Sequence, residues 1–259
     1  MTDDLSGITP RGLLRVLREW ISGTTPAAHG SSTYTSDATP VNPLPKRVAH
    51  YVIERKLGEG GMGVVFAARD ERLDRTVALK MMSSFSGDDT ARRRFWREAR
   101  AAASVNHPNI CQLYDIGEDE GELFIAMELL EGESLGERLA RGALTVSEAI
   151  PITLGVLAAL SALHARGIVH RDLKPSNVFL TAHGVKLLDF GLARPADPAL
   201  AQSLRSSGNL TRSGMLIGTP GYMAPEQLTA EDLDARTDLF AVGAILFEML
   251  AGRPGFVGH

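Results

Sequence analysis

The stretch His170-Arg171-Asp172-Leu173-Lys174-Pro175-Ser176-Asn177 decides how the rest of this chain is interpreted. It sets an acid, two bases and an amide between the apolar pairs Ile168-Val169 and Val178-Phe179, which places them on a loop between buried elements. Charged side chains are seldom fully buried unless paired, so such a loop contributes little to a core. A carboxylate, a cation and a metal-binding amide can instead converge on one charged substrate. Each residue alone would favour a solvated turn, but the whole stretch indicates a site.

The composition favours a globular chain in a reducing compartment. With 259 residues and 44% hydrophobic composition, it can bury a core as one two-lobed domain or two small domains. A net charge of -4 argues against nucleic-acid binding, which needs a basic excess. The single cysteine, Cys111, can form no internal disulfide. The N-terminus lacks signal-peptide features, and the apolar run at residues 239–250 is too short to span a bilayer, so we expect a cytoplasmic chain without a membrane segment.

The first 49 residues form an N-terminal extension. Apolar residues at helical spacing predict a short helix within residues 5–20. Residues 22–45 are rich in Ser, Thr, Gly, Ala and Pro and cannot bury enough surface to offset chain entropy, so they are interpreted as a linker.

The remainder divides into a strand-rich part, residues 50–131, and a helix-rich part, residues 132–259. Alternating and periodic apolar residues, with Gly and Pro between them, define the elements. The first part is expected to hold strands at 51–57, 64–69, 76–82, 112–116 and 122–129, and a helix at 88–106. The second is expected to hold helices at 134–141, 145–166 and 239–250, and a strand at 185–188.

The glycine pattern Gly58-x-Gly60-x-x-Gly63-x-Val65 lies between two predicted strands. A dinucleotide-binding fingerprint would need a helix after the glycines. Glycines between two strands instead suit a flap whose backbone N–H groups cover phosphates, although such a pattern alone can be a flexible turn.

Three further motifs are ordinary one by one. Lys80 ends an apolar strand, and Glu98 in the following helix could pair with it or face solvent. Asp189-Phe190-Gly191 follows the strand at 185–188, where a carboxylate could bind Mg²⁺ through oxygen. Ala224-Pro225-Glu226 carries no meaning by itself.

Taken in order, these motifs match the signature set of protein kinases. From about Tyr51 onward the chain resembles a bacterial Hanks-type, eukaryotic-like Ser/Thr protein kinase. The resemblance implies an α+β, two-lobed fold with a small antiparallel-sheet N-lobe, one main helix there, and a mostly helical C-lobe. It also implies ATP and Mg²⁺ as cofactors and proteins bearing Ser or Thr as substrates.

The same resemblance places the nucleotide between the lobes. Lys80 would hold the α- and β-phosphates and be oriented by Glu98, while Met127 would be the gatekeeper before the hinge. The residues expected to bind ATP are Leu57, Gly58, Gly60, Gly63, Val65, Ala78, Lys80, Met127, Glu128, Leu130 and Phe179.

The resemblance also assigns the chemistry. Asp172 is the expected catalytic base, Lys174 steadies the transferring phosphoryl group, and Asn177 and Asp189 carry two Mg²⁺ ions. The lysine two residues after the aspartate is typical of Ser/Thr-specific enzymes.

The segment from Asp189 to Glu226 resembles an activation segment. Thr211 and Ser213 are the expected autophosphorylation sites, with Arg171 as the charge partner of the added phosphate. Thr219 and Glu226 belong to the expected substrate-binding segment.

Two internal contacts are also implied. His170 and Phe190 are expected to stack with Ala102 and Leu113 in an apolar column, with Asp238 anchoring its base.

The chain departs from the family pattern at its C-terminus. Kinases of this type continue through further helices, one of which supplies an arginine partner for the residue equivalent to Glu226. We therefore expect a C-terminally incomplete C-lobe, a Glu226 without its partner, and an exposed apolar patch on the helix at 239–250.

The leading hypothesis is thus an ATP- and Mg²⁺-dependent protein Ser/Thr kinase. A catalytically impaired nucleotide-binding or scaffolding module is the alternative, and a small-molecule kinase of the same fold is a weaker one. The physiological substrate, the activating signal and the oligomeric state are left open by the sequence.

Overall fold

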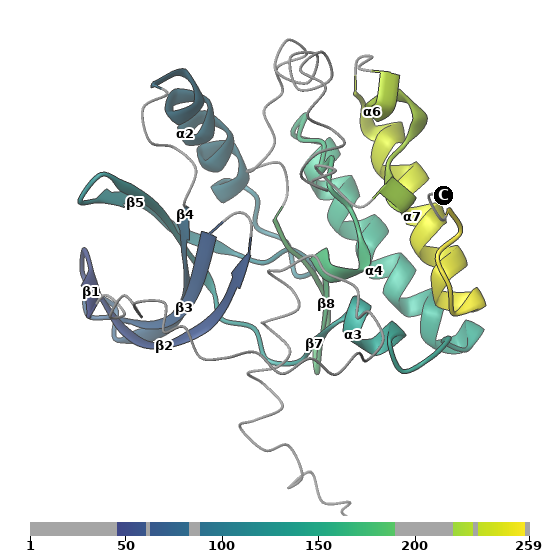
Figure 1. Ribbon diagram of the computed structural model, residues 1–259, viewed down its shortest axis with the longest axis horizontal. Coiled ribbons are helices and arrows are strands. Elements are labelled where there is room, and N and C mark those ends of the chain that lie inside the picture. Colours follow the sequence, from purple (N-terminus) through teal and green to yellow (C-terminus); the bar gives the residue numbers. More distant parts are fainter. Residues whose placement is uncertain (1–45, 61–62, 83–88, 190–219, 230–232, 257–259) are drawn as a thin grey trace, which may run out of the picture.

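The computed structural model describes residues 46–60, 63–82, 89–189, 220–229 and 233–256. Within these ranges the chain forms a six-stranded sheet with one helix, followed by a helical lobe that carries a three-stranded sheet (Figure 1). The predicted two-lobed α+β fold is confirmed. The expected helix at 5–20, the linker, Phe190, Thr211, Ser213 and Thr219 lie outside the described residues.

The N-lobe sheet is antiparallel and has the strand order β1-β2-β3-β4-β6-β5. Its strands are β1 (Arg47–Val48), β2 (Tyr51–Gly60), β3 (Gly63–Asp70), β4 (Arg75–Met82), β5 (Leu113–Asp119) and β6 (Glu122–Glu128). β1 lies ahead of residue 50, where the structured part was expected to begin. In β4, Val77 and Leu79 pack in an outer apolar cluster, whereas Ala78 joins the core shared with the C-lobe, as strand alternation requires.

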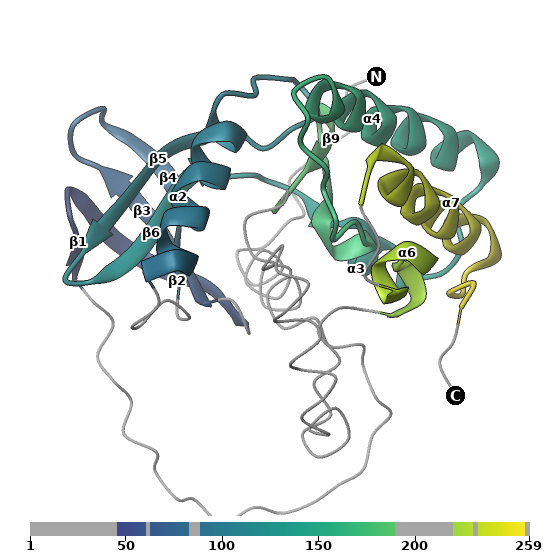
Figure 2. The ribbon, with the colours of Figure 1, turned by 90° about the horizontal axis from the view of Figure 1, so that it is seen from above.

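Helix α2 (Asp89–Ala103) is the one helix described in the N-lobe and lies beside the sheet (Figure 2). Phe95, Ala99 and Ala102 are buried at helical spacing, so one stripe of the helix faces the core. The helix ends three residues before the predicted position 106, and the Ser104 hydroxyl donates to the Ala101 carbonyl at 2.7 Å in its last turn.

The C-lobe is built on α3 (Leu135–Leu139), α4 (Val146–His164), α6 (Pro225–Thr229) and α7 (Ala235–Ala251). Its small sheet contains β7 (Glu133–Ser134), β8 (Val178–Thr181) and β9 (Gly184–Leu187), and the 3₁₀ turns are η1 (Pro175–Asn177) and η2 (Pro220–Tyr222). Capping boxes start α3 at Ser134 and α4 at Thr145. Asp234 caps α7, which therefore begins four residues before the predicted apolar run at 239–250.

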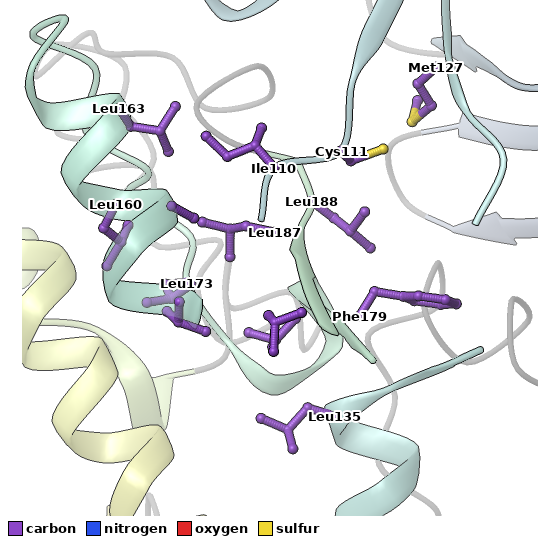
Figure 3. Packing of buried hydrophobic residues seen from close by; sticks show 14 of the residues in the cluster. Ile110, Cys111, Met127, Leu135, Leu160, Leu163, Leu173, Phe179, Leu187 and Leu188 are labelled. Carbon is purple, nitrogen blue, oxygen red and sulfur yellow. The ribbon is translucent and has the colours of Figure 1, made fainter. Parts of the chain in front are cut away.

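One apolar core joins the two lobes. Ile110 forms a parallel bridge with Leu187 of β9, so the segment between α2 and β5 is tied directly to the C-lobe. Figure 3 shows Cys111 and Met127 from the N-lobe side close to Leu188 and Phe179 of the C-lobe. This shared core fixes the junction at which the site lies.

Helix α4 has 19 residues and, in the described part of the chain, is the one helix long and apolar enough to span a membrane by length and composition. The expectation of no membrane segment considered only the shorter apolar run at residues 239–250 and not α4. In the structure α4 packs against β9 and α7 as a core helix of the lobe. Its outer face exposes Val146, Ile150 and Leu154.

The outer face of α7 is also apolar and exposed, as predicted. Leu239 and Phe247 on the helix, together with Phe256 beyond it, line a groove of about 400 Å³, and Phe256 is 57% exposed.

Candidate active site

The loop at residues 170–177 brings its charged side chains together. Asn177 donates from Nδ2 to the Asp172 carbonyl at 2.7 Å and to the Asp172 carboxylate at 3.3 Å. The Lys174 ammonium lies 3.3 Å from the same carboxylate. The predicted base, cation and amide therefore form one contiguous group rather than a solvated turn.

Asp238, at the start of α7, holds the backbone of this loop. Its buried carboxylate accepts from the His170 N–H at 2.8 Å, from the Arg171 N–H at 2.9 Å and from the His164 ring at 2.7 Å. Arg171 adopts φ +67°, a left-handed conformation that non-glycine residues rarely take without surrounding support. The predicted anchoring role of Asp238 is thus visible as two backbone hydrogen bonds.

His170 is completely buried beneath the loop. Its Nε2 lies 2.9 Å from the Leu188 carbonyl, and its Nδ1 accepts from the Asp172 N–H at 3.3 Å. This pair of contacts requires the neutral imidazole with hydrogen on Nε2. Burial lowers the pKa of His170, although the nearby charges of Asp238 and Asp172 act in the opposite direction. The predicted column partners Ala102 and Leu113 are buried as well.

Lys80 and Asp189 meet across the junction of the lobes. The Lys80 ammonium lies 2.8 Å and 2.9 Å from the two carboxylate oxygens of Asp189. Leu188, the preceding residue, donates its N–H to the Asn177 carbonyl at 2.9 Å. Asn177 and Asp189, both expected to bind metal, therefore come from neighbouring backbone segments, and Lys80 on β4 reaches Asp189.

The donor set fits a hard cation. Asn177 uses its amide nitrogen on Asp172, and within the described ranges its Oδ1 accepts no hydrogen bond. That oxygen and the Asp189 carboxylate are the ligand types that Mg²⁺ prefers. No cluster of three or more His, Cys, Asp or Glu side chains able to hold a metal occurs in the part of the chain that the structure describes.

The expected nucleotide pocket is lined from both lobes. The buried side chains of Leu57, Val65 and Ala78 belong to the same apolar core as Met127 and Phe179, and Leu130 packs against it. Val65 pairs with Lys80, and Ala78 with Met127, in the sheet register. An apolar wall beside Lys80, which is expected to bind phosphate, is suited to a planar base.

The glycine pattern forms the end of the β2–β3 hairpin. Gly58 and Gly60 lie in β2, and Gly63 begins β3 opposite Gly60. Gly63 has φ +131°, and a Cβ there would lie 1.8 Å from the Met81 carbonyl oxygen. Only glycine fits this position, so the hairpin backbone can lie against β4.

The hinge carries an ion pair that the sequence reasoning missed. Glu128 at the end of β6 accepts from the Lys186 ammonium on β9 at 2.8 Å. Strand alternation at 185–188 could have identified Lys186, because its neighbours Val185 and Leu187 are buried on the other face. Glu98 is half-buried on α2, and its pairing with Lys80 stays a prediction.

The described part of the expected substrate-binding segment is anchored to α7. Glu226 accepts from the Thr237 hydroxyl at 2.9 Å, so the expectation that Glu226 lacks a partner is wrong in that respect. The expected partner was an arginine, whereas in the structure the buried Thr237 hydroxyl on the adjacent helix donates to Glu226. Tyr222 donates to Glu248 further along α7.

The chain matches the protein kinase domain family over residues 51–259. It belongs to this family. Among curated relatives of this chain, a probable serine/threonine-protein kinase of Streptomyces coelicolor is 43% identical over 223 residues, covering 83% of this chain and 32% of the relative. The serine/threonine-protein kinase pkn3 of Myxococcus xanthus is 43% identical over 216 residues, covering 80% of this chain and 39% of the relative.

Solved structures agree with the fold. The kinase domain of Mycobacterium tuberculosis PknI superposes with a TM-score of 0.66 at 33% identity, covering 81% of this chain and 77% of that one. The chain spans between about a third and a half of the length of the curated relatives it matches.

Proposed function

We propose that this chain is an ATP-dependent protein serine/threonine kinase that transfers the γ-phosphoryl group of ATP to Ser or Thr hydroxyls of proteins. The observation that carries the proposal is the convergence of Asp172, Asn177, Asp189 and Lys80 at one junction between the lobes. Membership of the kinase family and the serine/threonine-kinase names of its relatives support the same activity.

Asp172 is proposed to accept the proton of the acceptor hydroxyl. The hydroxyl oxygen then bonds to the γ-phosphorus, the bond from that phosphorus to the bridging oxygen breaks, and ADP leaves. Lys174, beside Asp172, neutralises charge on the transferring group, and Lys80 holds the remaining phosphates. Positioning and cations carry most of the catalysis, because phosphoryl transfer needs little covalent help.

Asn177 and Asp189 are the residues that would hold Mg²⁺, which when bound neutralises charge on the phosphate oxygens. The hairpin of β2 and β3 would cover the phosphates, and the hinge from Glu128 to Leu130 would read the adenine edge through its backbone. We further propose a cytoplasmic location, which the single buried cysteine, suited to a reducing compartment, supports.

Phosphate transfer from [γ-³²P]ATP to a generic basic protein tests the proposal. Asp172→Asn should lower the rate by about 10²-fold or more, since a positioned base contributes at least that much. Asp74→Asn, at an exposed N-lobe carboxylate that pairs with Arg69, serves as the matched control and should leave the rate unchanged. ATP binding without transfer that depends on Asp172 would favour the impaired nucleotide-binding or scaffolding module instead.

The proposal extends to regulation. Phosphorylation of Thr211 or Ser213 would order the activation segment, with Arg171 as the charge partner. Mass-spectrometric mapping after incubation with ATP should find phosphate on one of these residues, and an active preparation with neither phosphorylated would refute this part.

A further inference from the structure

Gln227 on α6 touches two functional segments at once. Its Oε1 accepts from the Ala224 N–H at 3.0 Å, and its Nε2 donates to the Arg171 carbonyl at 2.8 Å. Ala224 belongs to the expected substrate-binding segment, and Arg171 directly precedes Asp172. One amide side chain therefore joins the catalytic loop to the segment that is expected to receive the peptide.

Helix capping explains only half of this arrangement. Ala224 stands at the N-cap position of α6 and Gln227 at N3, where Gln or Glu commonly accepts from the N-cap N–H. A glutamate would serve that contact equally well. The second contact, from Nε2 to Arg171, needs a donor that a carboxylate lacks. The choice of an amide is therefore explained by the catalytic loop and not by the cap.

The contact acts on a backbone position that needs support. Arg171 is left-handed, with φ +67°, and its N–H is held by Asp238. Gln227 holds the carbonyl of the same residue, so side chains from α7 and α6 grip Arg171 on both sides. The peptide plane held by Gln227 is the one that leads into Asp172.

The remaining contacts keep α6 itself in place. Thr237 bonds to Glu226 and ties α6 to α7 independently of Gln227. Asp172 and Lys174 line a cavity of about 10 Å³ together with Tyr222 and Gln227, so little space is left between the loop and the segment.

We propose that Gln227 is a positioning residue that sets the register between the peptide-binding segment and Asp172. The inference rests on the proposed kinase function, because it assigns a peptide to that segment. Loss of the bridge leaves the nucleotide site intact while the acceptor hydroxyl is presented at the wrong place. Hydrolysis of ATP by water needs no peptide-binding segment. Loss of the bridge should therefore impair phosphoryl transfer to a peptide but not ATP hydrolysis.

The experiment compares Gln227→Met, Gln227→Glu and the matched control Gln112→Met in the full chain. Gln112 is also half-buried, but its side-chain amide donates only to the carbonyl of its neighbour Leu113. The readouts are KM and kcat for a Ser/Thr peptide, KM for ATP, and ATP hydrolysis without peptide. Thermal unfolding shows that each variant is folded.

Gln227→Glu, which loses only the bond to Arg171, should lower kcat/KM for the peptide about three- to tenfold, with unchanged KM for ATP and unchanged hydrolysis. Gln227→Met, which also loses the bond to Ala224, should lower it at least as much. Gln112→Met should behave as the wild type. A Gln227→Glu variant with wild-type peptide kinetics would reduce Gln227 to a helix cap and overturn the proposal. Equal losses in peptide transfer and ATP hydrolysis would also overturn it, because they would place Gln227 in general support of Asp172.

These outcomes are separable from failure of the kinase function. If the wild type itself shows no hydrolysis or transfer that depends on Asp172, the proposed function fails. If the wild type is active and the Gln227 variants match it, only the positioning role fails.

Discussion

His170 should make the stability of this protein fall as the pH drops below the ordinary histidine value. The imidazole is completely buried and neutral, and burial lowers its pKa in the folded state. In the unfolded chain the pKa returns to about 6.5. Below that pH the unfolded state binds more protons than the folded state, so the free energy of unfolding decreases with falling pH.

The size follows from linkage. At pH 5.5, one unit below the unfolded value, His170 contributes a loss of up to about 1.4 kcal/mol relative to neutral pH. The loss disappears well above the pKa of His170 in the unfolded state. It grows as the pH falls toward the lower pKa of His170 in the folded state. The carboxylates of Asp238, Asp172 and Asp189 act to raise the pKa of His170 and set the lower end of this window.

The assay is urea unfolding at pH 7.5, 6.5 and 5.5 for the wild type and His170→Phe. Phenylalanine removes the two hydrogen bonds that the His170 ring makes, to the Asp172 N–H and to the Leu188 carbonyl, so it should cost about 1–3 kcal/mol at pH 7.5. The free energy of unfolding of His170→Phe should nevertheless decrease less steeply than that of the wild type as the pH falls from 7.5 to 5.5. His183→Gln, at an exposed imidazole, is the control. Parallel pH profiles for wild type and His170→Phe would refute the reasoning.

Other variants test the rest of the site. Lys186→Met should weaken binding of a non-hydrolysable ATP analogue about two- to fivefold by calorimetry, because the hinge carboxylate loses its ion pair, whereas Arg138→Met in a distant pair should not. Asp238→Asn should cost about 2–4 kcal/mol in urea unfolding, since its amide turns a donor toward a backbone N–H, and a loss below about 1 kcal/mol would contradict this role. Gly63→Ala should destabilise the protein more than Gly121→Ala, because both glycines have positive φ but only the first has a carbonyl oxygen in the way of a Cβ; equal thermal shifts would count against the close approach.

Local signals in the sequence predicted most of the elements, because their causes are local. The capping residues Ser134 and Thr145 mark helix starts wherever they occur before a periodic apolar run. The observed boundaries differ from the predicted ones where an element does not begin with an apolar residue. Helix α7 is an example, because its first turn is polar and follows the N-cap Asp234. Asp172 and Asp189 could be predicted as chemistry-bearing residues because a single short motif holds each one.

By itself, the sequence determined the two lobes and the order of most elements, since these follow from residue type and spacing, and it predicted from motifs which side chains carry chemistry. Only the tertiary structure decided that Lys80 meets Asp189 and that Lys186 pairs with Glu128. It also decided that Gln227, besides capping α6, donates a hydrogen bond to Arg171. These contacts join residues distant in the chain, and their energies depend on the direction of individual side chains across a shared core. No periodicity or propensity encodes such directions, so packing of the two lobes had to supply them.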